Sequence, residues 1–217
     1  MIDPGVNGFV GALDRAIAIS NLPGIIETVP SFRSLLIIYE PEVIGLDSLI
    51  GELRPLIGDG SKSTMIKGRS WTVPVAYGYP DGGDLSEIRD ATGLSRDEVI
   101  AIHCSAEYQI YLIGFVPGLP IIGGLPPALH LPRRPEPRPD IPAGRVMIGG
   151  MQVQIVPMPM LTGWHTLGQT PIRPYDRGAV NPFLFRSGDR IRFRPISVEE
   201  LNALAGVPVG HFLTAGD

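Results

Sequence analysis

Apolar and polar positions in the first 60 residues follow two helical and two extended patterns. The predicted elements are a helix after Asp3-Pro4, strands at 25–29 and 35–39, and a helix through 46–53. Asn21 should end the first helix. Pro55 should bend or end the second, because proline lacks a backbone donor and clashes with the preceding turn. The order α-β-β-α predicts a small α+β domain at residues 1–60.

Residues 61–70 are mostly small or polar and are predicted to form a linker. The short apolar runs that follow are separated by glycine and proline, which is typical of a barrel or a sandwich and predicts a mainly-β domain at 71–217. Strands are predicted at 71–76, 108–115, 145–148, 152–156, 164–167 and 190–193. A capping residue followed three positions later by an acid predicts short helices near 85–92, 96–102 and 198–205, capped by Asp84, Ser95 and Ser197.

Composition narrows the classes of function. The chain has 217 residues, a net charge of −4 and only 18% charged residues, which favours either a permanent partner or a loop-rich β-protein. It has no block of basic and aromatic residues, so a nucleic-acid partner is not expected. The apolar runs are too short for a membrane span and no secretory signal is evident. With a single cysteine, Cys104, a cytoplasmic protein is expected.

Several kinds of catalytic motif are missing from the sequence. It has no Gly-x-Ser-x-Gly turn and no convincing phosphate loop, and its histidines lack metal-ligand spacing, so no metal site is expected. His103 and Cys104 are adjacent, but neighbours in a helix or strand do not face one another, which favours a buried Cys104 over a catalytic pair.

Two loops are candidates for binding. The glycine-rich stretch 114–125 could present backbone amides to a carboxylate or a partner strand, or it could be a tight structural crossover. The proline-rich stretch 131–139 should be extended, and its arginines could bind an anion or simply face solvent.

Short motifs containing glycine or proline follow one another through most of the chain. They include Ile113-Gly114-Phe115, Pro117-Gly118, Gly123-Gly124-Leu125, Leu131-Pro132-Arg133-Arg134, Gly149-Gly150-x-Gln152, Gly163-Trp164 and Ser187-Gly188-Asp189-Arg190. In this order they resemble the signature of the allophanate hydrolase subunit 1 family, also called the KipI family, which includes the B-type subunits of 5-oxoprolinase.

The resemblance implies an α+β N-terminal domain followed by a cyclophilin-like β-barrel. Family members usually begin with one or two further strands, so the N-terminal domain of this chain, which starts at Met1 with a helix, is expected to lack its first strands. The implied function is that of a non-nucleophilic subunit in a hydrolase that opens an amide or lactam, of the ATP-dependent 5-oxoprolinase or the allophanate hydrolase type. Its implied partner is a homologous, KipA-like subunit 2, and ATP is expected on another subunit.

The resemblance also suggests which residues would act. His103 would shuttle protons, and Arg133 would hold a substrate carboxylate. Gln152 and the backbone near Gly118 and Gly150 would polarise a carbonyl, and Thr170 would line the same pocket. The alternative function is a regulatory binding protein that inhibits a sensor histidine kinase, which would need a docking surface rather than pocket chemistry.

Overall fold

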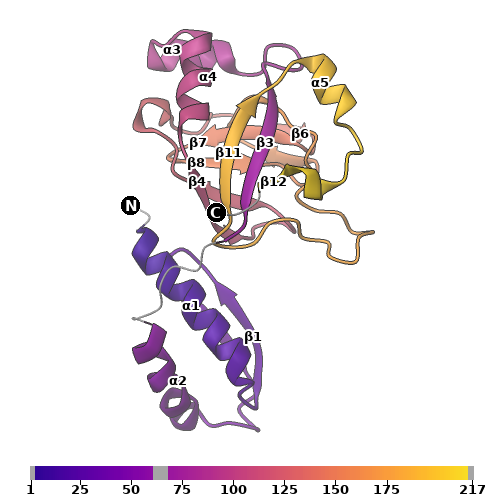
Figure 1. Ribbon diagram of the computed structural model, residues 1–217. Helices are drawn as coiled ribbons and strands as arrows, with labels where there is room; N and C mark the ends of the chain where they lie inside the picture. The colour runs from indigo at the N-terminus through magenta and orange to yellow at the C-terminus, as the bar shows by residue number, and fades with distance from the viewer. Residues whose placement is uncertain (1–2, 61–67, 215–217) are drawn as a thin grey trace. The chain divides into compact units, whose positions relative to one another are not determined.

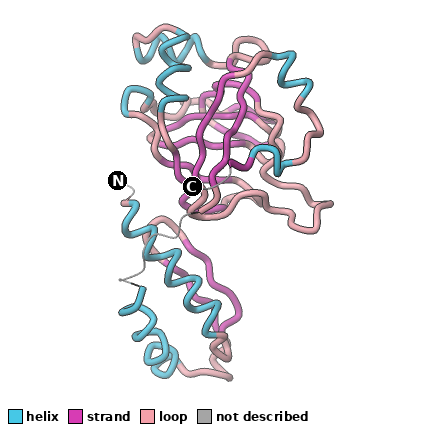
Figure 2. Tube along the Cα trace, in the orientation of Figure 1, coloured by secondary structure: helices cyan, strands magenta, loops and turns pink. Residues whose placement is uncertain are grey.

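The computed structural model describes residues 3–60 and 68–214, and the chain divides into two compact units with their boundary between residues 67 and 68 (Figures 1 and 2). Most of the predicted linker, residues 61–67, lies outside the described residues. Its last residue, Ser70, is instead the first residue of a strand.

The first unit contains α1 (Pro4–Ser20), β1 (Ile25–Pro30), β2 (Leu35–Tyr39) and α2 (Leu46–Gly60). The Asp3 carboxylate accepts hydrogen bonds from the first free amides of α1, and Asn21 ends that helix in the left-handed conformation at φ 48°. The strands β1 and β2 form an antiparallel hairpin, and α1 contacts both α2 and β1.

Pro55 was expected to bend or end the second helix. It does not end it, because α2 continues through Pro55 to Gly60. Pro55 lacks the amide that would bond to the carbonyl of Gly51, but Gly51 is exposed, so water can satisfy that carbonyl.

The second unit is a closed barrel (Figure 1). Within residues 68–214, seven strands follow the order β10-β7-β8-β5-β4-β11-β3, and β3 pairs back with β10 to close the ring. Only β3 and β11 run parallel; the other pairs are antiparallel, and the short β12 (Leu213–Thr214) adds to β3. The ring strands are β3 (Ser70–Tyr77), β4 (Tyr108–Ile113), β5 (Pro120–Gly123), β7 (Arg145–Gly149), β8 (Gln152–Ile155), β10 (His165–Gln169) and β11 (Arg190–Pro195).

The hydrophobic pattern did not reveal every strand. It missed β5, β12 and the two-stranded sheet of β6 (Arg138–Ile141) and β9 (Met160–Thr162), each of which has four residues or fewer. The predicted strand 108–115 ends at Ile113, because Phe115 takes a left-handed conformation at φ 74°.

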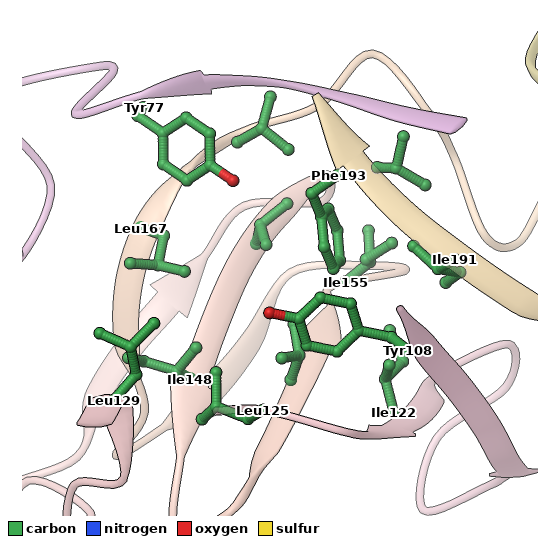
Figure 3. Close-up of a cluster of buried hydrophobic side chains, with 14 of the residues drawn as sticks. Tyr77, Tyr108, Ile122, Leu125, Leu129, Ile148, Ile155, Leu167, Ile191 and Phe193 are labelled. Carbon is green, nitrogen blue, oxygen red and sulfur yellow. The ribbon is translucent and has the colours of Figure 1, made fainter. Parts of the chain in front are cut away.

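Side chains from all around the ring fill the barrel (Figure 3). Tyr77, Tyr108 and Phe193 are among the labelled members of this core, together with branched aliphatic residues. Helices α3 (Leu85–Thr92) and α4 (Arg96–Ser105) contact β10 and β11 respectively, and both contact the 3-10 turn at Pro127–Leu129. The last α-helix, α5 (Val198–Ala203), contacts β3.

Candidate functional site

Charged side chains gather where α3, the N-terminal end of β10 and the extended segment 131–139 meet. We call Asp84, Glu87, Arg134, Arg138 and His165 the Asp84 cluster. Its members are up to 81 positions apart, and the barrel brings them together by placing α3 beside β10.

Asp84 is the buried centre of this cluster, with 4% of its surface exposed. Both of its carboxylate oxygens accept hydrogen bonds from Arg138, one of them at 2.8 Å, and the backbone N–H of Thr166 donates to it at 2.6 Å. A second guanidinium, that of Arg134, lies 3.7 Å away. Two cations and a backbone donor therefore compensate the buried charge.

This arrangement corrects the expectation that Asp84 forms a capping box with Glu87. Asp84 precedes α3, but its side chain makes no cap hydrogen bond. The carboxylate is engaged by Arg138 and Thr166, and charge-assisted bonds are stronger than a neutral cap bond. The box at Ser95 is complete, whereas Ser197 accepts from the Glu200 amide while the Glu200 carboxylate pairs with Arg194.

Glu87 forms the outer part of the cluster. Its carboxylate bonds to Arg134, which lowers the pKa of Glu87 and raises that of Arg134. The Glu87 carboxylate also lies 3.5 Å from Nδ1 of His165. Since the other ring nitrogen of His165 donates to the carbonyl of Pro132 at 3.0 Å, Nδ1 is the nitrogen that faces Glu87. The Nε atoms of Arg134 and Arg138 are buried with no hydrogen-bond partner in the described part of the chain.

Arg133 lies next to the cluster but differs from the other two arginines. It is exposed, its guanidinium lies 5.5 Å from the centre of the Trp164 ring, and it has no acidic partner within the described ranges. Trp164 itself packs against Gly149, where any Cβ would lie 2.8 Å from the ring. Arg133 is thus a cation on a rigid aromatic support, and it can bind a carboxylate without breaking an existing ion pair.

Gly150 pairs with Leu131, two residues before Arg133 in the chain, and Gln152 follows two residues after Gly150. Gly150 turns the chain from β7 to β8 at φ 60°, and its amide donates to the carbonyl of Leu131 at 2.6 Å. That amide is therefore already used and does not point to a substrate carbonyl. Gln152 is half-buried at the start of β8, where it pairs with Gly149 and Gly123.

The other two predicted binding residues are placed elsewhere. Thr170 follows the C-terminal end of β10, and that strand alone spans about 13 Å from His165. Its hydroxyl is buried and accepts from the Ile172 amide. Gly118 lies before β5, packed so closely on Tyr175 that a Cβ would lie 2.5 Å from that side chain. The predicted residues thus do not form one pocket with Arg133.

His103 is enclosed in the barrel core. Its Nδ1 lies 2.6 Å from the Tyr77 hydroxyl, and its ring centre lies 4.4 Å from that of Phe193 (Figure 3 shows these two partners). Burial lowers the pKa of His103 to about 3, so the ring is neutral at physiological pH. The assignment of His103 as a proton shuttle stays a prediction that this geometry does not favour.

The sequence interpretation missed the acidic half of the cluster. From the sequence, Asp84 is predicted to cap a helix, and neither His165 nor Arg138 is predicted as a site residue, although the arginines of 131–139 are candidates for binding an anion. In residues 3–60 and 68–214, no three histidine, cysteine or acidic side chains gather as a metal site would require, and no helix is long and apolar enough to cross a membrane.

Comparison with known proteins identifies relatives over most of the chain. The family model described as "Carboxyltransferase domain, subdomain C and D" matches residues 1–185. The B-type subunit of 5-oxoprolinase from Bacillus subtilis (strain 168) is 34% identical over 212 residues, covering 93% of this chain and 88% of that protein. Its namesake from Escherichia coli O157:H7 is 36% identical over 176 residues, which cover 81% and 80%.

Solved structures of related proteins match the fold of this chain. The crystal structure of TTHA0988 superposes with a TM-score of 0.80 at 35% identity, covering 91% of this chain but only 38% of that longer chain. The protein PH0987 from Pyrococcus horikoshii matches with a TM-score of 0.59 at 33% identity, covering 93% and 92%. The Kluyveromyces lactis urea amidolyase, at 20% identity and a TM-score of 0.74, shares the fold. The resemblance drawn from the sequence motifs is confirmed: this chain belongs to the carboxyltransferase-domain family of subdomains C and D, together with the B-type subunits of 5-oxoprolinase.

Proposed function

We propose that this chain is one subunit of a multi-subunit enzyme that opens the lactam ring of 5-oxoproline to glutamate with ATP. The observation that carries the proposal is the 34% identity to a B-type 5-oxoprolinase subunit across 93% of this chain. Allophanate, a related amide, is the second substrate to test. The comparisons offer no support for the alternative of a sensor-kinase inhibitor.

The charged site gives the proposal a chemical basis. 5-Oxoproline carries one carboxylate beside its lactam. The exposed guanidinium of Arg133 can bind such a carboxylate in a bidentate manner, while the neighbouring Arg134 and Arg138 are neutralised by acids. In this proposal Arg133 orients the substrate, and the Asp84 cluster holds the segment that carries Arg133.

A partner would supply the nucleophile. Cys104, the single cysteine of the chain, is half-buried, and burial raises the pKa of its thiol, which makes it a poor nucleophile near neutral pH. The partner we propose is a KipA-like subunit 2, with ATP bound outside this chain. In support, a chain related to this one makes up only part of the longer TTHA0988 polypeptide, so related sequences occur joined to further protein.

The test is reconstitution. The chain is co-expressed with candidate partner subunits, purified by size exclusion, and assayed for ATP-dependent release of glutamate from 5-oxoproline. We expect a stable complex whose activity needs every subunit. The substitution Arg133→Ala should raise the KM for 5-oxoproline by about tenfold or more, because a charge-assisted bidentate contact is lost.

The matched control is Arg177→Ala, which removes another exposed arginine, far from Arg133 in sequence. It should leave KM unchanged. A complex that forms but does not convert 5-oxoproline would reject the substrate, and the absence of any complex would reject the proposed assembly. An unchanged KM in Arg133→Ala would remove Arg133 from the site.

A further inference from the structure

A cavity that contains no member of the Asp84 cluster lies between the C-terminal end of β10 and the segment that follows α5. We call it the β10–α5 cavity. Its volume is about 520 Å³, within the range of small-molecule sites, and residues 169–176 and 201–212 form most of its wall. None of the six residues predicted from the sequence, apart from Thr170, lines it.

One wall of this cavity is apolar. The side chains of Leu201 and Phe212 are buried apart from the small part that lines the cavity. The cavity is also lined by Val207, Pro208 and Val209. An aliphatic group seated there would remove apolar surface from water on both sides.

The lining of the cavity also includes Gln169, which offers a hydrogen-bond acceptor. The side-chain amide nitrogen of Gln169 donates to the carbonyl of Ala143 at 3.0 Å and to that of Thr170 at 3.2 Å. Both amide hydrogens are therefore used. The side-chain oxygen of Gln169 has no donor within the described part of the chain, so it can accept an N–H from a ligand.

Two side chains of opposite charge also line the cavity. Arg173 and Asp176 are three positions apart, both line the cavity, and neither has an ion-pair partner among the described residues. Asp176 is held in place because one of its carboxylate oxygens accepts from the Gly178 amide at 2.9 Å and its own amide donates to Pro182. The other oxygen is available for a cation.

Gln169 and Arg173 both pack closely on Gly144. At φ 84°, a Cβ there would lie 2.3 Å from the amide nitrogen of Gln169 and 3.3 Å from Nη1 of Arg173. The absence of a side chain lets both residues approach the same backbone, which fixes the acceptor and the cation on one side of the cavity.

We propose that the β10–α5 cavity binds a free α-amino acid with an aliphatic side chain. Arg173 takes the carboxylate, Asp176 and the Gln169 oxygen take the ammonium group, and the aliphatic side chain packs on Leu201 and Phe212. The site requires a zwitterion, because a ligand with only one charge would leave Arg173 or Asp176 unpaired while displacing the water that solvates it.

The probe is L-leucine, titrated into the purified full chain by isothermal calorimetry. The comparison ligands are 4-methylpentanoate, which lacks the ammonium group, and 3-methylbutylamine, which lacks the carboxylate. We expect saturable binding of L-leucine and binding of each comparison ligand weaker by about tenfold or more, since one charge-assisted contact is lost. No saturable binding of L-leucine, or equal binding of the three ligands, would overturn the proposal.

Variants locate the site. Arg173→Gln and Asp176→Asn should each weaken L-leucine binding by about tenfold or more. The matched control Arg177→Gln changes an exposed arginine of the same loop that does not line the cavity and should bind as the unmodified chain does. Binding that survives both cavity substitutions would refute the assignment. The measurement needs no partner and no turnover, so its result is separate from that of the 5-oxoproline assay.

Discussion

The substitution Asp84→Asn tests whether the Asp84 cluster holds the 131–139 segment on the barrel. It removes the buried carboxylate that both Arg134 and Arg138 approach, and the side chains of these arginines are 22% and 36% exposed. Removing one partner of a fully buried ion pair costs about 3–5 kcal/mol. Because solvent reaches more than a third of the Arg138 side chain, we expect a smaller loss, about 2–3 kcal/mol, in the free energy of unfolding.

The assay is urea unfolding followed by tryptophan fluorescence. The two tryptophans, Trp71 and Trp164, are both buried in the barrel unit, so the signal reports on that unit and not on residues 3–60. A loss of this size should also lower the Tm by roughly 5–10 °C. The variant should in addition show weaker 5-oxoproline binding in the assembled enzyme if the cluster positions Arg133.

The matched control is Asp97→Asn. Asp97 also lies near an arginine, at 3.5 Å from Arg96, but its side chain is 90% exposed. Its replacement should change the free energy of unfolding by less than about 0.5 kcal/mol. If Asp84→Asn costs no more than Asp97→Asn, the carboxylate does not hold the segment and the reasoning fails.

Two further predictions concern the barrel. Burial lowers the pKa of His103 from 6.5 to about 3. Between these pH values His103 is protonated in the unfolded chain and neutral in the folded chain. The contribution of the neutral ring to the free energy of unfolding is therefore fully present above pH 6.5 and is lost as the pH falls towards 3. His103→Gln should therefore flatten the loss of stability between pH 6.5 and 5 by up to about 1.4 kcal/mol per pH unit in urea titrations, and an unchanged slope would contradict the burial of a neutral ring. Gly168→Ala places a Cβ 2.3 Å from the carbonyl of Ala76 at the β3–β10 closure and should cost about 1–3 kcal/mol, whereas Gly210→Ala, with open space around it, should cost little. Equal urea midpoints for the two glycine variants would rule out a tightly closed seam.

Local signals in the chain predicted local structure well. The helical pattern after Asp3, the stop at Asn21 and the capping box at Ser95 all appear where expected, because each depends on residues within one or two helical turns. The strands with strong apolar runs were also found. The short strands β5, β6 and β9 were missed, since so few residues carry little periodic signal.

The partners of the arginines in segment 131–139 could not be predicted from the sequence. The sequence predicted an extended segment whose arginines bind an anion or face solvent, and the resemblance suggested Arg133, but neither could show which arginine lacks an acidic partner. Arg134 and Arg138 have acidic partners from α3 and the residue before it, whereas Arg133 has an aromatic one, Trp164. That distinction depends on which side chains the fold brings near each arginine.

By itself, then, the sequence determined the family, the helices and most strands of the chain, because ordered motifs and periodic patterns are properties of neighbouring residues. Only the tertiary structure decided that Asp84 is a buried counter-ion rather than a helix cap, because its partners Arg138 and Thr166 lie 54 and 82 positions away. The tertiary structure likewise showed that Thr170 and Gly118 do not share a pocket with Arg133. Closure of the barrel determines these contacts, and a pairing across so many residues leaves no local trace in the sequence.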